Sequence, residues 1–159
     1  MVVGDRELPP LMTLGLGEQI LAPEGSRGEV LEQLLAVGAG AALVVAPPHT
    51  YGGEPLADLM RDRRVTHAFI TPAALATVDP VGLDDLHTVI VGGEACPPEL
   101  VNRWAPGRRF FNGYGPTEAT VVASAKQLFP GEAVTIGWPL DGWDLAVAED
   151  GELIIGGVG

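Results

Sequence analysis

The sequence predicts an α/β fold in which helices cover both faces of a mostly parallel sheet, followed by the start of a small all-β segment. Two observations support this prediction. Up to about residue 114, short apolar runs of strand length alternate with segments of helical periodicity, and this order implies crossovers between parallel strands. After Tyr114, segments of strand character follow one another without a helix between them.

The first element with a clear period is a helix over residues 29–37, whose apolar side chains recur at spacings of three and four. We expect Gly38 and Gly40 to end it, because glycine is common just past a helix C-terminus. Residues 42–46 are continuously apolar and stop at two prolines, which is typical of a strand buried on both faces. The readable part of the chain therefore begins with a helix that leads into a buried strand.

The same alternation continues to residue 112. Thr71-Pro72 predicts a helix start, because a hydroxyl cap followed by proline suits the first helical turn. In chain order, we expect a helix over 54–63, a strand over 67–70, a helix from Thr71, a strand over 88–91, a helix from Pro97 to Trp104 and a strand over 109–112.

The last part of the chain is predicted to be all β. We expect strands over 120–125, 133–136, 143–148 and 152–155, with Asp150-Gly151 as a tight hairpin turn between the last two. The chain then divides into residues 1–28, which show no clear period, an α/β segment over 29–125 and a β segment over 126–159. Because the sequence stops directly after a strand, we interpret the β segment as truncated.

Composition narrows the possible partners and locations. A net charge of −12 with a single lysine, Lys126, disfavours nucleic acid, because binding to a phosphate backbone needs clustered positive charge. No apolar run approaches the roughly 18–20 residues that span a bilayer. Residues 1–20 carry charges and prolines, which do not suit a signal peptide. These features predict a cytoplasmic protein without membrane or nucleic-acid partners.

Two glycine-rich loops follow predicted strands at the edge where open α/β sheets bind ligands. The first is residues 92–95, directly after the strand over 88–91, and the second is residues 112–118. Glycine lets a flat ligand or a phosphate approach the backbone closely. We therefore expect a ligand site at this edge of the sheet.

The second loop carries four groups that suit a magnesium nucleotide. Tyr114 offers a face on which a purine can stack, and Asn112 can exchange hydrogen bonds with a base edge. Thr117 offers a hydroxyl to a phosphate oxygen, and Glu118 is a hard oxygen ligand suited to Mg²⁺. These groups predict a site for ATP and Mg²⁺. On spacing alone, a surface turn rich in glycine and proline is the alternative.

Phe111–Glu118 reads Phe-Asn-Gly-Tyr-Gly-Pro-Thr-Glu and resembles the signature motif of adenylation domains of nonribosomal peptide synthetases. These domains belong to the AMP-forming superfamily of acyl- and aryl-CoA synthetases and luciferases. Pro116 is more typical of the amino-acid branch. Residues 90–95 are similar to the family's core strand and following loop, and residues 151–159 are similar to the opening of its next core motif. The resemblance covers residues 29–159.

The resemblance implies a flavodoxin-like subdomain, followed by a β subdomain, and a reaction in two stages. A carboxylate attacks the α-phosphate of ATP in the presence of Mg²⁺, which gives an acyl-adenylate and pyrophosphate. The acyl group then passes to the phosphopantetheine thiol of a carrier protein domain. The implied partners are ATP, a small apolar amino acid, the remainder of the adenylation domain and the carrier domain, in secondary metabolite biosynthesis.

The resemblance also implies roles for individual residues. Tyr114 would stack on adenine and Asn112 would flank it, and the other cofactor-binding positions are Gly92, Gly93, Gly113, Gly115 and Thr117. The catalytic candidates are Thr117, at the α-phosphate, and Glu118, as the metal ligand. The substrate pocket would consist of Phe69, Ile90, Gly92, Gly113, Val121 and Val122. That set carries no charge and suits an apolar amino acid, although its branched side chains would equally suit an ordinary core.

Several parts of the family's machinery have no counterpart in this sequence. The phosphate-gripping loop rich in Ser, Thr and Gly, the ribose-binding aspartate and the catalytic lysine are not found, and Lys126 lies in the wrong place to replace that lysine. Residues 23–29 also lack the aspartate that pairs with the substrate ammonium. We therefore expect little or no turnover from this chain alone.

Two alternatives stay open at this point. One alternative to the adenylation-domain fragment is a catalytically inactive remnant or excised subdomain that acts only through association, and the other is a fragment of an acyl- or aryl-CoA ligase. The missing aspartate favours the ligase, whereas Pro116 opposes it.

Overall fold

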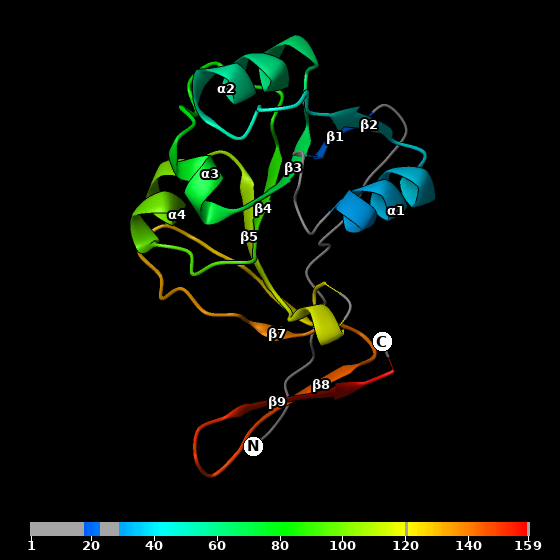
Figure 1. Ribbon diagram of the computed structural model, residues 1–159. Helices are drawn as coiled ribbons and strands as arrows, with labels where there is room; N and C mark the ends of the chain where they lie inside the picture. The colour runs from blue at the N-terminus through cyan, green and yellow to red at the C-terminus, as the bar shows by residue number, and fades with distance from the viewer. Residues whose placement is uncertain (1–17, 23–28, 120, 159) are drawn as a thin grey trace.

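The computed structural model describes residues 18–22, 29–119 and 121–158. Figure 1 shows one sheet with helix α1 (Glu29–Ala39) on one side and helices α2 (Gly53–Asp62), α3 (Pro72–Ala76) and α4 (Pro98–Trp104) on the other. A two-stranded hairpin lies beyond the end of this sheet. The predicted α/β class with a small β addition is confirmed. None of the helices in the described ranges has the length and apolar character needed to span a bilayer.

The sheet has seven strands in the order β2-β1-β3-β4-β5-β6-β7. Their bounds are β1 Gln19–Ala22, β2 Ala42–Val45, β3 His67–Ile70, β4 Thr88–Val91, β5 Arg109–Tyr114, β6 Ser124–Gln127 and β7 Trp138–Pro139. Strands β1 to β5 pair in parallel, whereas β6 and β7 pair antiparallel. The order β2-β1-β3-β4-β5 is that of flavodoxin-like folds.

Strand β1 lies in the part of the chain that shows no sequence period. Residues 1–17 and 23–28 lie outside the described residues, so the expectation for residues 1–28 can be compared only at the strand itself. β1 occupies a central place between β2 and β3, where Ile20 and Leu21 are buried. Sequence reasoning missed it because the residues around it include many glycines and prolines and show no alternation of strand and helix.

In the α/β part, the predicted elements form close to their expected bounds. Strands β3 and β4 begin and end as predicted. Of the two glycines expected to end helix α1, Gly38 lies inside the helix, which continues to Ala39. The helix stops at Gly40, whose φ of +66° is the left-handed conformation that glycine adopts without strain.

The β segment differs from the prediction. Residues 133–136, expected as a strand, are irregular, and the strand expected over 120–125 forms later, as β6. Strands β6 and β7 extend the main sheet from β5, so β6 runs across the boundary expected at residue 125. An edge strand presents unpaired N–H and C=O groups that can pair with any strand that reaches them. Local periodicity does not reveal which segment will supply that strand. Strands β8 (Trp143–Val147) and β9 (Leu153–Gly157) form the predicted hairpin.

Helices α2 to α4 pack on the sheet face that carries Val89, Val91 and Phe110, which are fully buried with Trp104 of α4. Side chains alternate between the two faces along each strand. The register places Phe69 beside Ile90 and Ile90 beside Phe111, so these three side chains share the opposite face. Because β3, β4 and β5 are parallel, their carboxyl ends lie together at one edge of the sheet.

Arg108 fastens the loop between α3 and β4 to the start of β5. Its guanidinium donates to the carbonyls of Pro80 at 3.3 Å, Leu83 at 2.9 Å and Leu86 at 3.0 Å. The same group lies 5.5 Å from the centre of the Trp104 ring. One side chain thus joins the loop, α4 and the central sheet.

Arg108→Lys is expected to lower the free energy of unfolding by about 1–3 kcal/mol, because one ammonium cannot span three carbonyls that a planar guanidinium reaches. Chemical denaturation measures the change. Arg63→Lys, at an exposed position at the end of α2, is the matched control. Equal stability of the two variants would contradict this role for Arg108.

Candidate functional site

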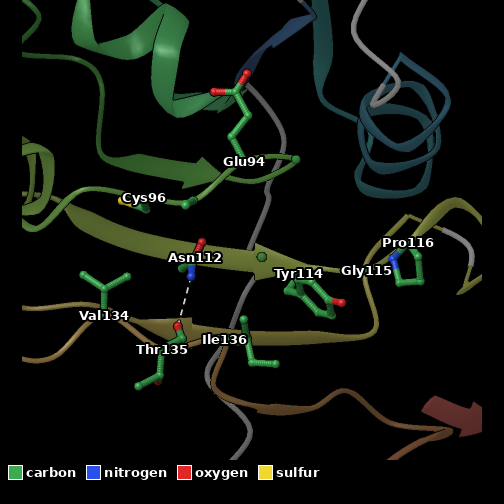
Figure 2. Close-up of a pocket in the computed structure, with 12 residues that line it drawn as sticks. Glu94, Cys96, Asn112, Tyr114, Gly115, Pro116, Val134, Thr135 and Ile136 are labelled. Atoms are coloured by element: carbon green, nitrogen blue, oxygen red, sulfur yellow. Dashed lines mark hydrogen bonds between the residues drawn. The ribbon is translucent and has the colours of Figure 1, made fainter. Parts of the chain in front are cut away.

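A cavity of about 580 Å³ lies at the carboxyl ends of β4 and β5. Figure 2 shows the loop after β4 along one side, the end of β5 in the middle and residues 134–136 along the other side. The lining residues are Gly93, Glu94, Ala95, Cys96, Asn112, Gly113, Tyr114, Gly115, Pro116, Val134, Thr135 and Ile136. The two loops expected to carry the site are therefore brought together, and a third segment joins them.

Most of the predicted cofactor-binding residues line this cavity. They are Gly93, Asn112, Gly113, Tyr114 and Gly115. Gly92 lies just behind the wall and is buried. A Cβ at Gly92 would lie 3.0 Å from the Gly113 carbonyl oxygen and 3.2 Å from Cζ of Phe69. Gly92 therefore allows a close approach between the loop and β5 that a larger residue would obstruct.

Tyr114 is the last residue of β5, and its side chain remains accessible, with 37% of the residue exposed. Figure 2 shows its ring beside the cavity, between Gly115 and Ile136. Its backbone is held in place, because the Tyr114 carbonyl accepts a hydrogen bond from the Ala123 amide at 2.8 Å. The hydrogen bond thus fixes the backbone from which the ring projects, while part of the residue stays accessible to solvent.

Asn112 is buried, and its side chain is oriented by residue 135. The Asn112 amide nitrogen donates to the Thr135 carbonyl at 3.0 Å. Figure 2 shows the amide oxygen on the opposite side, toward the loop that carries Glu94 and Cys96. The hydrogen bond gives the amide a direction and holds the 134–136 segment against β5.

Residues 134–136 were missed as part of the site, because their apolar run predicts only a strand. Their position depends on Gly137, whose φ is +77°. A Cβ on Gly137 would overlap the Ala125 carbonyl on β6. No local signal marks this wall, since its contacts join residues far apart in the sequence.

Thr117 and Glu118 do not line the cavity. They form, with Ala119, a short 3₁₀ helix, η1 (Thr117–Ala119), directly after Pro116, and both are exposed. The turn before them is tight, since a Cβ on Gly115 would lie 2.7 Å from the Val121 carbonyl oxygen. Thr117 and Glu118, the side chains predicted to contact the phosphate and the metal ion, therefore follow the cavity-lining residues directly and are exposed.

Five of the six predicted substrate-pocket residues gather at the ends of β3, β4 and β5. Phe69 lies against Gly92, and a Cβ on Gly113 would lie 3.7 Å from Cγ2 of Ile90 and 3.6 Å from Cγ1 of Val122. Val121 differs, because its φ of +76° is rare for a β-branched residue. Its carbonyl faces Gly115 instead. An apolar cluster thus adjoins the cavity.

Cys96 lines the cavity and is buried. Burial raises the pKa of the Cys96 thiol, since a thiolate is poorly solvated there. The thiol therefore stays protonated near neutral pH, which agrees with a small packing residue.

The comparisons with known proteins agree with this geometry. The family model described as "AMP-binding enzyme" matches residues 23–159. The probable non-canonical nonribosomal peptide synthetase CymA of Salinispora arenicola is 46% identical over 153 residues, which cover 88% of this chain and 2% of the relative. Novobiocin biosynthesis protein H of Streptomyces niveus is 45% identical over 149 residues, which cover 87% of this chain and 25% of the relative. The chain thus spans a quarter or less of the length of these relatives.

A solved structure shows the same fold. PA1221, an NRPS protein containing adenylation and PCP domains, superposes with a TM-score of 0.76 over 91% of this chain and 27% of its own, at 23% sequence identity. The chain therefore belongs to the AMP-binding enzyme family, in which it corresponds to part of an adenylation domain of the nonribosomal peptide synthetase type.

Proposed function

We propose that this chain forms the nucleotide-binding part, and one side of the substrate pocket, of a domain that activates an amino acid with ATP and Mg²⁺. The cavity at the end of β5 carries the proposal, because an accessible aromatic ring, an oriented amide and a glycine-rich loop meet there. Membership of the AMP-binding enzyme family supports it.

The orientation of Asn112 supports adenine as the base. One N–H of its amide is engaged with Thr135, and the amide oxygen, which can accept a hydrogen bond, points toward the loop that carries Glu94 and Cys96. The exocyclic amino group of adenine is a donor, whereas guanine presents an acceptor at that position. Tyr114 projects from the same side of β5 as Asn112, since residues two apart share a face. A base stacked on Tyr114 would therefore reach the amide.

Thr117 and Glu118 would meet the phosphates, because η1 follows the cavity directly. Bound Mg²⁺ would neutralise phosphate charge. No cluster of three or more metal-binding side chains occurs in the described part of the chain. The ion at Glu118 would then share phosphate oxygens and water, as Mg²⁺ commonly does. Thr117 would orient the α-phosphate for attack by the substrate carboxylate.

The apolar cluster around Gly92 and Gly113 supports an apolar amino acid as substrate. Phe69, Ile90 and Val122 approach these glycines without any charged group among them. An uncharged side chain gains by leaving water there, whereas a buried charge would lack a partner. The acyl group would then pass to the phosphopantetheine thiol of a carrier domain.

Tyr114→Ala is expected to weaken ATP binding about tenfold, because base stacking on an aromatic ring contributes about 1–3 kcal/mol. Tyr114→Phe keeps the ring and should bind nearly as well as the original chain. Isothermal titration calorimetry measures both. Tyr51→Ala, which removes an exposed tyrosine outside the cavity, is the control. Unchanged affinity in Tyr114→Ala would reject the stacking role.

Glu118→Gln is expected to abolish the gain in ATP affinity that Mg²⁺ produces, because an amide is a weaker ligand than a carboxylate for a hard cation. Binding of adenosine, which has no phosphate, should stay the same. Titrations with and without Mg²⁺ measure the difference, with Glu99→Gln on α4 as the matched control. A full Mg²⁺ effect in Glu118→Gln would rule out this carboxylate as the ligand.

Pyrophosphate exchange with a panel of amino and aryl acids tests the activity. We expect exchange with apolar amino acids from a version of the chain extended at both ends, and little from the chain alone, since charge stabilisation by the lysine and loop not found here lowers the barrier. Exchange by neither version would favour the inactive remnant. Exchange only with acids that lack an amine would favour the acyl- or aryl-CoA ligase.

A further inference from the structure

The loop after β4 is packed at both ends and exposed in the middle. Gly92 is buried between the Phe69 ring and the Gly113 carbonyl, and Cys96 is buried at the other end. Gly93, Glu94 and Ala95 are exposed, yet they form one side of the cavity. The position of this exposed middle part therefore sets the width of the cavity opposite Tyr114.

Glu94 ties the middle of the loop to the start of α3. Its carboxylate oxygen Oε2 accepts a hydrogen bond from the Ala73 amide at 3.1 Å. The next amide of that helix, Ala74, donates to Oγ1 of Thr71 at 3.3 Å, and Pro72 has no amide hydrogen. Two side chains from different loops thus satisfy the first amide donors of α3, which have no partner within the helix itself.

The direction of the Glu94 side chain suits a tether and not a ligand group. Figure 2 shows it extending away from Asn112 and Tyr114, while its backbone runs along the cavity. Its negative charge is therefore kept away from the cavity, where it would repel an anionic nucleotide. A hydrogen bond between a carboxylate and an amide is stronger than one between neutral groups.

We propose that Glu94 is a positioning residue for nucleotide binding: by holding the loop over residues 92–96 against α3, it keeps the Gly93 backbone at the distance from Tyr114 that a bound base requires. This inference rests on the proposed function, because a purine nucleotide is the ligand. It assigns a specific task to a side chain that the motif comparison leaves without one. Its physical basis is a single hydrogen bond between residues 21 positions apart.

Calorimetric titration with ATP and with AMP tests the ligand part of the proposal. Glu94→Ala is expected to weaken both nucleotides about five- to tenfold, the range expected for one hydrogen bond. Glu94→Gln keeps an acceptor oxygen and should recover most of the affinity. Glu99→Ala, an exposed glutamate of α4 outside the cavity, should bind as the original chain does. The melting temperature should fall by no more than a few degrees, because loss of one cap at a helix end costs about 1 kcal/mol and Glu94 lies outside the core.

Amide hydrogen exchange without nucleotide tests the tether independently. Glu94→Ala should speed exchange at Ala73 and at Gly93–Ala95, leave the amides of β4 unchanged, and be reversed in Glu94→Gln. Unchanged exchange would overturn the tether, and faster exchange with unaltered nucleotide affinity would overturn its role in binding. If the original chain bound neither nucleotide, the proposed function and the ligand role of Glu94 would both fall, while the exchange data would still decide whether Glu94 holds the loop.

Discussion

The alternation of side chains at the end of β5 is the constraint on which the site depends. Asn112 and Tyr114 project to one side of this strand, and Phe111 and Gly113 project to the other. Phe110 and Phe111, both fully buried on opposite faces, hold the register. A slip of one residue would exchange the two faces and place the amide and the phenol among apolar groups. The register of β5 therefore decides which side of the strand presents the amide and the phenol.

The cavity lies at the carboxyl ends of the strands, as the general rule for open α/β sheets expects, but not at the place in the strand order that this rule favours. That rule points to the crevice where the strand order reverses, here between β1 and β3. The described cavity lies farther along, at β4 and β5, because antiparallel strands β6 and β7 extend the sheet and bring residues 134–136 opposite the loop after β4. The hydrogen bond from Asn112 to Thr135 joins this added wall to the parallel part of the sheet.

The scaffold and the cavity walls are stabilised by different forces. The strands rest on apolar contacts with α2 to α4, which are non-directional and spread over many residues. The walls rest on a few directional contacts, chiefly the amide of Asn112, the carboxylate of Glu94 and the close backbone approaches at Gly92 and Gly115. Loops held in this way open at lower cost than the core. The walls can therefore open without disturbing the strands that position them.

The sequence by itself determined the α/β class, the bounds of β3 and β4, the edge of the sheet at which the cavity lies and the part of the motif, Asn112 to Pro116, that lines it. These follow from local periodicity, from caps and from adjacent residue types. Only the tertiary structure decided that β1 is a central strand, that residues 134–136 are a cavity wall and that the Asn112 amide has one orientation. Each of those features depends on contacts between distant segments, and no local pattern of apolar and polar residues encodes which distant segment will supply the partner.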